Sequence, residues 1–180
     1  MAAPILPGST LGILGGGQLG RMFCIAARNM GYRLSVLDPD PDSPAGHLAD
    51  HHIEAAYSDE KALDEMARSC DVITTEFENV PAESMRRLSQ SKPVYPTAEV
   101  LEIAQNRNQE KAFASKAGLT PAANHPGVSE TDLEQAIEVT GLPAILKTAT
   151  LGYDGKGQYV VASLQQAQQA FRDSGAIECV

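Results

Sequence analysis

The chain has 180 residues, of which 43% are hydrophobic, 21% charged and 5% aromatic, as in a globular protein of one domain or of one domain plus part of another. Its 23 acidic residues exceed its 14 lysines and arginines, so the formal net charge of −9 disfavours nucleic acid and anionic membranes as partners. The sequence has no signal-peptide pattern, no apolar run long enough to span a bilayer and no CxxC spacing, so we expect a cytoplasmic protein without a disulfide framework or a zinc site.

Short apolar strands alternate with amphipathic helices from Leu11 to about Tyr95, which is the pattern of an α/β domain. Hydrophobic residues at helical spacing follow the first strand, and Gly31 ends that helix. We predict strands at 11–14, 34–37, near 53 and at 71–75, with helices at 19–30, after a Ser58 cap and from about Pro81.

Beyond residue 96 the pattern changes to helices without intervening strands, and we place a domain boundary at about residue 100. A helical stretch over 97–117 is predicted to break at Gln105, because Asn106 followed by Gln109 resembles a capping box. This break places Arg107 in the first turn of the second helix. The later predicted elements are a helix from Ser129 to Gly141, a strand ending at Lys147, a glycine hairpin, a helix from Ser163 through Phe171 and a strand over 176–180.

A lysine-bearing, glycine-rich hairpin directly follows the strand that ends at Lys147. Glycines at 152, 155 and 157 let the backbone adopt positive φ and approach a ligand closely, so that backbone N–H groups can point at phosphate oxygens. Lys147 and Lys156 would supply positive charge. The glycines could instead serve turn geometry alone, but three glycines in six residues between two lysines are more than a turn requires. We therefore predict a site for a small phosphorylated ligand.

A second glycine-rich segment, Gly15-Gly-Gly-Gln-Leu-Gly20, lies between a predicted strand and a predicted helix and matches the dinucleotide-binding fingerprint. Asp38, eighteen residues further on, could accept a hydrogen bond from the ribose of NAD. The same turn can hold any anion, including the single phosphate of a ribonucleotide. An NAD-linked oxidoreductase would leave the lysine-bearing loop without a role, so two anion sites favour two phosphate-bearing ligands. The oxidoreductase and a non-catalytic nucleotide-binding module remain the alternatives.

Four sequence strings together resemble one enzyme family. They are GGGQLGRM ending at Met22, EFENVP at 76–81, Arg107 followed by Lys111, and Lys147 with GYDGKGQ at 152–158. In combination they are similar to the 5-(carboxyamino)imidazole ribonucleotide synthases, which are ATP-grasp enzymes of purine biosynthesis. The resemblance runs in register from about residue 11 to residue 161.

The resemblance implies an α/β fold with two parts. A Rossmann-like preATP-grasp domain with a parallel sheet would occupy residues 1–100, and the truncated first part of an α+β ATP-grasp domain would occupy residues 101–180. The adenine-binding segment, the acidic Mg²⁺ ligands and a basic substrate-binding region would then lie beyond Val180. We therefore expect the chain alone to be incomplete and inactive, and the complete enzyme to be a homodimer.

The implied reaction is the ATP-dependent carboxylation of aminoimidazole ribonucleotide by bicarbonate through carboxyphosphate, in purine (IMP) biosynthesis and with Mg²⁺ as the metal cofactor. No catalytic residue and no metal ligand is assigned within the chain. By the resemblance, the ATP-binding residues are Arg107, Lys147, Gly152, Tyr153, Asp154, Gly155, Lys156, Gly157 and Gln158. The ribonucleotide-binding residues are Gly17, Gln18, Leu19, Glu76, Tyr153 and Lys156. Without the resemblance, Arg107 could equally be a solvated helix residue, and Glu76 could be hydrated or paired with a lysine.

Overall fold

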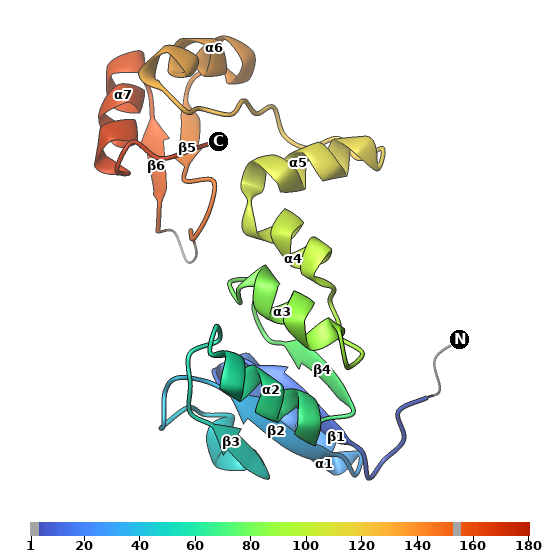
Figure 1. The fold of residues 1–180 in the computed structure, drawn as a ribbon. Coiled ribbons are helices and arrows are strands. Elements are labelled where there is room, and N and C mark those ends of the chain that lie inside the picture. The colour runs from blue at the N-terminus through green and yellow to red at the C-terminus, as the bar shows by residue number, and fades with distance from the viewer. Residues whose placement is uncertain (1–3, 153–155) are drawn as a thin grey trace. The chain divides into compact units, whose positions relative to one another are not determined.

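The computed structural model describes residues 4–152 and 156–180. The chain divides into two compact units, Met1–Glu102 and Ile103–Val180 (Figure 1). Each unit has a hydrophobic core of its own. Within the described ranges, no helix has the length and apolar character needed to cross a bilayer.

The first unit contains a parallel sheet of four strands among its described residues (Figure 1). The strands, in the order β3-β2-β1-β4, are β1 (Thr10–Leu14), β2 (Arg33–Leu37), β3 (His51–Ile53) and β4 (Val72–Thr75). Leu14 lies opposite Leu37 on one side and Thr75 on the other. Strands of a parallel sheet are buried on both faces, which is why β1 and β2 consist mainly of apolar residues. The predicted α/β fold with a parallel sheet is confirmed.

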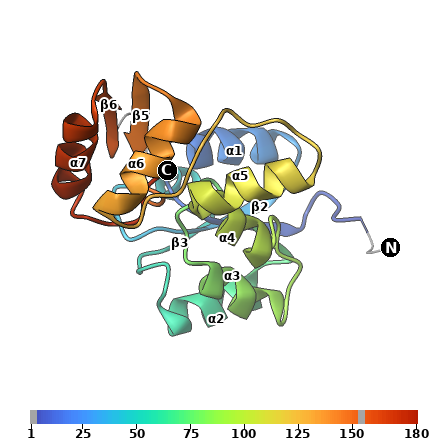
Figure 2. The ribbon, with the colours of Figure 1, turned by 90° about the horizontal axis from the view of Figure 1, so that it is seen from above.

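Helices cover both faces of this sheet, and Figure 2 shows α1 and α2 on opposite sides of the strands. Cys24 of α1 belongs to the same buried cluster as Ile13 of β1. Met66 of α2 and Met85 of α3 belong to another cluster, with Leu14, because neighbouring residues of a strand point to opposite faces. The helices are α1 (Gln18–Asn29), the 3₁₀ helix η1 (Gly46–Leu48), α2 (Glu60–Ser69) and α3 (Ala82–Ser89), while α4 (Ala98–Gln105) spans the division between the units.

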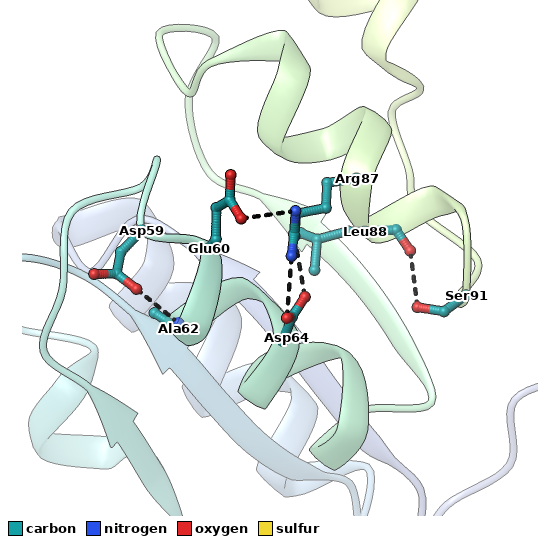
Figure 3. Close-up of polar contacts among 7 residues, drawn as sticks. All are labelled: Asp59, Glu60, Ala62, Asp64, Arg87, Leu88 and Ser91. Carbon is teal, nitrogen blue, oxygen red and sulfur yellow. Dashed lines mark hydrogen bonds and ion pairs between the residues drawn. The ribbon is translucent and has the colours of Figure 1, made fainter.

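The start of α2 and its contact with α3 are held by polar side chains (Figure 3). The predicted Ser58 cap is wrong by one residue, because Asp59 caps α2 through a hydrogen bond of 2.9 Å from a backbone N–H in the first turn. Aspartate caps helices as well as serine does, and the sequence offers both in succession. Arg87 of α3 donates two N–H groups to Asp64 at 3.0 Å each and pairs with Glu60 at 3.2 Å.

The second unit is built on an antiparallel pair of strands, as the sequence predicted for the hairpin. Lys147 at the end of β5 lies opposite Gln158 at the start of β6. Leu133 of α6 and Phe171 of α7 share a buried cluster with Leu146 of β5, so both helices pack against the hairpin. The elements are α5 (Arg107–Lys116), α6 (Glu130–Thr140), β5 (Ala144–Lys147), β6 (Gln158–Val161) and α7 (Leu164–Asp173).

Two predicted helix starts in this unit are confirmed with their capping side chains. Asn106 caps α5, because its Oδ1 accepts from the N–H of Gln109 at 3.1 Å. Ser163 caps α7, because its Oγ accepts from the N–H of Gln166 at 3.2 Å. The Gln166 side chain in turn accepts from the N–H of Ala162, the residue before the cap, at 2.7 Å.

The predicted strand over 176–180 is wrong in its extent. Ala176 has a φ of +54°, which is outside the extended region, and the segment forms only isolated bridges, from Cys179 to Gly127 and to Thr148. Val180 and Lys147 exchange two backbone hydrogen bonds of 2.8 Å each. The segment therefore runs beside β5 without becoming a regular strand.

Candidate functional site

The first candidate site lies at the carboxyl end of the parallel sheet, where open α/β sheets bind their ligands. β1 leads into α1 through the glycine segment, and Gly15 adopts a φ of +105°, which favours glycine. Asp38 follows β2 and Glu76 follows β4, the two strands that flank β1. Both carboxylates therefore arrive at the same turn.

Both carboxylates accept hydrogen bonds from backbone N–H groups of the glycine segment. The N–H of Gly17 donates to Glu76 Oε1 at 2.8 Å, and the N–H of Gly20 donates to Glu76 Oε2. The N–H of Gly16 donates to Asp38 Oδ2 at 2.6 Å. The N-terminus of α1 therefore faces a carboxylate of the protein itself, which is the charge that a helix N-terminus attracts.

A cleft of about 270 Å³ lies beside this turn. Asp38, only 8% exposed, also accepts from the Tyr57 hydroxyl at 2.7 Å and from the N–H of Asp40 at 2.8 Å. Burial and the hydrogen bond to Asp38 raise the pKa of Tyr57, so the phenol keeps its proton and remains a donor. The Tyr57 ring meets the Phe77 ring edge to face, with the centroids 5.6 Å apart. The cleft is lined by Gly16, Gly17, Asp38, Asp40, Ser43, Pro44, Tyr57, Glu76 and Phe77.

Of the residues predicted for ribonucleotide binding, the structure brings Gly17 and Glu76 together at this cleft. Gln18 and Leu19 open α1 with exposed side chains. Lys156 belongs to the second unit. The last predicted residue, Tyr153, lies outside the described residues.

Sequence reasoning missed the aromatic pair of the cleft, Tyr57 and Phe77. Phe77 lies within the EFENVP string and directly follows Glu76, so its position in the sequence could have indicated that it lies at the same site. Tyr57 follows a short strand in a loop and carries no such signal, because its contact with Asp38 depends on how β2 and β3 lie side by side.

The second candidate site lies at the end of β5. Lys147 of β5 and Lys111 of α5 both line a cleft of about 400 Å³ in the second unit. Apart from these two lysines the lining is largely apolar, and Ile145 and Leu146 contribute to it. Ammonium groups beside an apolar wall suit a nucleotide, because the wall can contact the base while the charges contact phosphates.

Arg107 holds the chain that leads from β5 into the glycine loop. Its guanidinium donates to the carbonyl oxygens of Thr148 at 2.8 Å and of Gly152 at 2.6 Å, and its backbone N–H donates to Ala149 at 2.8 Å. Leu151, between these carbonyls, has a φ of +60°. Such a conformation is unfavourable for a branched side chain, and the charge-assisted bonds on either side help to hold it.

The glycines of the loop that the structure describes are required by their neighbours. A Cβ at Gly152 would lie 2.9 Å from the backbone oxygen of Lys156, and a Cβ at Gly157 would lie 2.5 Å from Thr148 Oγ1. Gly157 also has a φ of +65°. The remaining predicted ATP-binding residues divide into two groups. Lys156 and Gln158 have exposed side chains, whereas Tyr153, Asp154 and Gly155 lie outside the described residues.

Neither site offers a set of metal ligands in the part of the chain that the structure describes. No group of three or more His, Cys, Asp and Glu residues is placed there to hold a metal ion. Cys24, Cys70 and Cys179 are free and buried, and burial raises the pKa of each thiol. A raised pKa keeps a thiol protonated and unreactive.

Comparison with protein families matches two successive parts of the chain. Residues 9–105 match the ribonucleotide synthetase preATP-grasp domain, and residues 112–179 match the ATP-grasp domain. N5-carboxyaminoimidazole ribonucleotide synthase of Pseudomonas aeruginosa is 46% identical over 171 residues, which cover 94% of this chain and 47% of that protein. The protein of the same name from Bacillus subtilis is 42% identical, over 92% of this chain and 44% of its own length. The chain thus spans about half the length of the curated relatives it matches.

Solved structures of similar proteins match the same portion. N5-carboxyaminoimidazole synthetase from Staphylococcus aureus, complexed with ADP, matches with a TM-score of 0.91 at 39% identity, over 97% of this chain and 47% of that one. N5-carboxyaminoimidazole synthase from Aspergillus clavatus, in complex with ADP and 5-aminoimidazole ribonucleotide, matches with a TM-score of 0.79 at 26% identity. The match covers 95% of this chain and 46% of that one. With its preATP-grasp match extending over more than half of its residues, the chain belongs to the ATP-grasp family of N5-carboxyaminoimidazole ribonucleotide synthases.

Proposed function

We propose that this chain forms part of a ligase that carboxylates aminoimidazole ribonucleotide with bicarbonate at the expense of ATP, in purine biosynthesis. The observation that carries the proposal is Lys147, which ends β5 beside a glycine loop and lines an apolar cleft in a family whose members bind ADP. We assign residues 1–100 to the preATP-grasp domain and residues 101–180 to the first part of the ATP-grasp domain. The names and bound ligands of the relatives support the proposed substrates.

The proposed chemistry begins with bicarbonate, which is a poor electrophile. A bicarbonate oxygen attacks the γ-phosphorus of ATP, ADP leaves, and the resulting carboxyphosphate delivers its carboxyl carbon to the exocyclic amine with release of phosphate and a proton. Phosphoryl transfer depends mainly on positioning and on neutralising charge. We assign these tasks in the second unit to Lys147 and to the loop residues from 152 to 158, with Arg107 holding the loop.

For the ribonucleotide we propose contacts in the first unit. Glu76 lines the cleft and can accept hydrogen bonds from hydroxyl or amine groups, while Gln18 and Leu19 stand exposed at the start of α1. The Tyr57 and Phe77 rings line the same cleft and offer an aromatic surface to a planar base.

The proposed enzyme needs Mg²⁺ to screen the phosphate charges, and the described residues do not supply the acidic cluster that this ion requires. As the resemblance implies, we propose that the metal ligands lie outside this chain. We also propose a homodimer for the complete enzyme and a cytoplasmic location, which agrees with three free cysteines.

Thermal unfolding with added nucleotides tests the proposal. We expect ATP to raise the Tm of the chain in a saturable manner and NADH to leave it unchanged, because a ligand that binds only the folded state stabilises it. Lys147→Ala should abolish most of the ATP response, since a charge-assisted contact contributes roughly 1.5–3 kcal/mol. Lys61→Ala, which removes the same charge from an exposed position on α2, should retain it. Protection by NADH alone would support the oxidoreductase, and protection by neither would contradict an ATP site in this chain.

A further inference from the structure

The three fingerprint glycines of the first unit all contact one side chain, that of Glu76. We propose that backbone N–H groups of the segment Gly15–Gly20 bind the carboxylate of the protein's own Glu76 and hold it in position. A ribonucleotide phosphate does not bind at these N–H groups. The proposal rests on the proposed function only for the identity of the ribonucleotide.

Glu76 makes the amide contacts that this fingerprint offers to phosphate in dinucleotide-binding proteins. Its Oε1 accepts from the N–H of Gly17 at 2.8 Å, and its Oε2 accepts from the N–H of Gly20. The N–H of Gly16, the residue before Gly17, donates to Asp38 at 2.6 Å. A phosphate at this turn would have to displace the Glu76 carboxylate and would then lie beside the charge of Asp38.

An added Cβ would collide with Glu76 at each fingerprint glycine. It would lie 2.4 Å from Glu76 Cγ at Gly15, 2.7 Å from Oε1 at Gly17 and 2.8 Å from Oε2 at Gly20. Separations below 3.0 Å are essentially never seen for real Cβ atoms. The φ of +105° at Gly15 and the backbone oxygen of Gly15, 2.8 Å from the Cβ position at Gly20, also favour glycine. A bound dinucleotide is therefore not needed to explain glycine at these positions, and the Glu76 side chain would have to move if a Cβ were added at any of them.

The charge of the adjoining cleft supports the same conclusion. Asp38, Asp40 and Glu76 all line a space of about 270 Å³. Three carboxylates around so small a cleft repel phosphate, whereas carboxylate oxygens accept hydrogen bonds from hydroxyl and amine groups. The glycine segment thus acts as a positioning element for Glu76, and a ribonucleotide in this cleft would present its ribose or its amine.

Chemical rescue of Glu76→Ala tests the proposal. Removing the carboxylate leaves the N–H groups of Gly17 and Gly20 without their partner, so we expect the Tm to fall by roughly 4–8 °C. Sodium formate, a carboxylate small enough for the space, should restore at least half of that loss in a saturable manner, with sodium chloride at equal ionic strength as the comparison. Glu54→Ala removes the same charge from an exposed side chain and should show neither the loss nor the response to formate.

Amide resonances of ¹⁵N-labelled protein give a second readout, which decides the matter if Glu76→Ala does not fold. In Glu76→Gln, which keeps the side-chain shape, the resonances of Gly17 and Gly20 should shift. In the wild type, inorganic phosphate should leave them in place. Saturable phosphate-induced shifts in the wild type, or no formate rescue in a folded Glu76→Ala, would overturn the proposal. Neither experiment contains a nucleotide, so a failure to bind ATP would contradict the proposed function and leave this proposal standing.

Discussion

Arg107 stands at the first position of α5 and connects that helix to the start of the glycine loop. Its guanidinium bonds to two carbonyls, those of Thr148 and Gly152, on either side of the positive φ of Leu151. The fork of N–H donors in arginine can bind two acceptors at once, which the single ammonium of lysine does with less directional control. In the structure, Arg107 is thus a residue that positions the loop, and a direct contact with ATP phosphates is a further, proposed role.

Arg107→Ala should loosen the loop more than it destabilises the rest of the chain. Losing two charge-assisted hydrogen bonds should lower the free energy of local opening at residues 148–152 by at least about 1.5 kcal/mol. Amide hydrogen exchange at Thr148 and Ala149 measures this, with Arg21→Ala, an exposed residue of α1, as the control. Unchanged exchange at both amides would show that the guanidinium does not hold the loop.

At the scale of elements, α2 and α3 pack through buried methionines and are joined at their surface by Arg87 (Figure 3). The hydrogen bond from Arg87 holds the pKa of the Asp64 carboxyl below its usual value. The two-pronged contact, both distances being 3.0 Å, is the favourable geometry for an exposed ion pair.

The pH dependence of stability should reveal this pair. Because the folded-state pKa of Asp64 is depressed, its contribution is present above the unfolded-state pKa, near 4, and is lost as the pH falls through the folded-state value. The wild type should therefore exceed Asp64→Asn in stability at pH 7, and the difference should vanish in acid. Urea unfolding of both proteins from pH 7 to pH 2 measures it. A difference that persists unchanged at pH 2 would contradict the assignment.

The sequence predicts elements well where local signals and packing agree. Asn106 and Ser163 cap their helices as predicted, because a capping side chain acts within one turn. Ser58 was wrong because an equally good cap, Asp59, follows it. The strand over 176–180 failed because periodicity does not reveal the positive φ of Ala176.

The candidate sites were less accessible to sequence reasoning. The glycine fingerprint indicated an anion at the N-terminus of α1, and an anion is there, but it is a carboxylate delivered by a strand that lies far away in sequence. Hydrogen bonds between residues 17 and 76 depend on strand order, which a pattern of local residues does not specify.

At the scale of the whole molecule, the charged residues that line the two clefts differ in sign. The chain carries a net charge of −9, so phosphate groups are attracted only where cations are placed locally. Lys111 and Lys147 line the cleft of the second unit, whereas the cleft of the first unit is lined by carboxylates. This difference supports our proposal that the phosphates of ATP bind in the second unit.

The most direct test of the proposed function is ATP-dependent incorporation of ¹³C-labelled bicarbonate into aminoimidazole ribonucleotide. The chain would be assayed alone and joined to the region of the Pseudomonas aeruginosa relative that lies beyond the matched segment. The joined protein should incorporate label only when ATP is present and should lose most of this activity in Lys147→Ala, while the 180-residue chain alone should show none. Cooperative unfolding establishes that the joined protein is folded. A folded joined protein that incorporates no label, or incorporation by the 180-residue chain alone, would contradict the account.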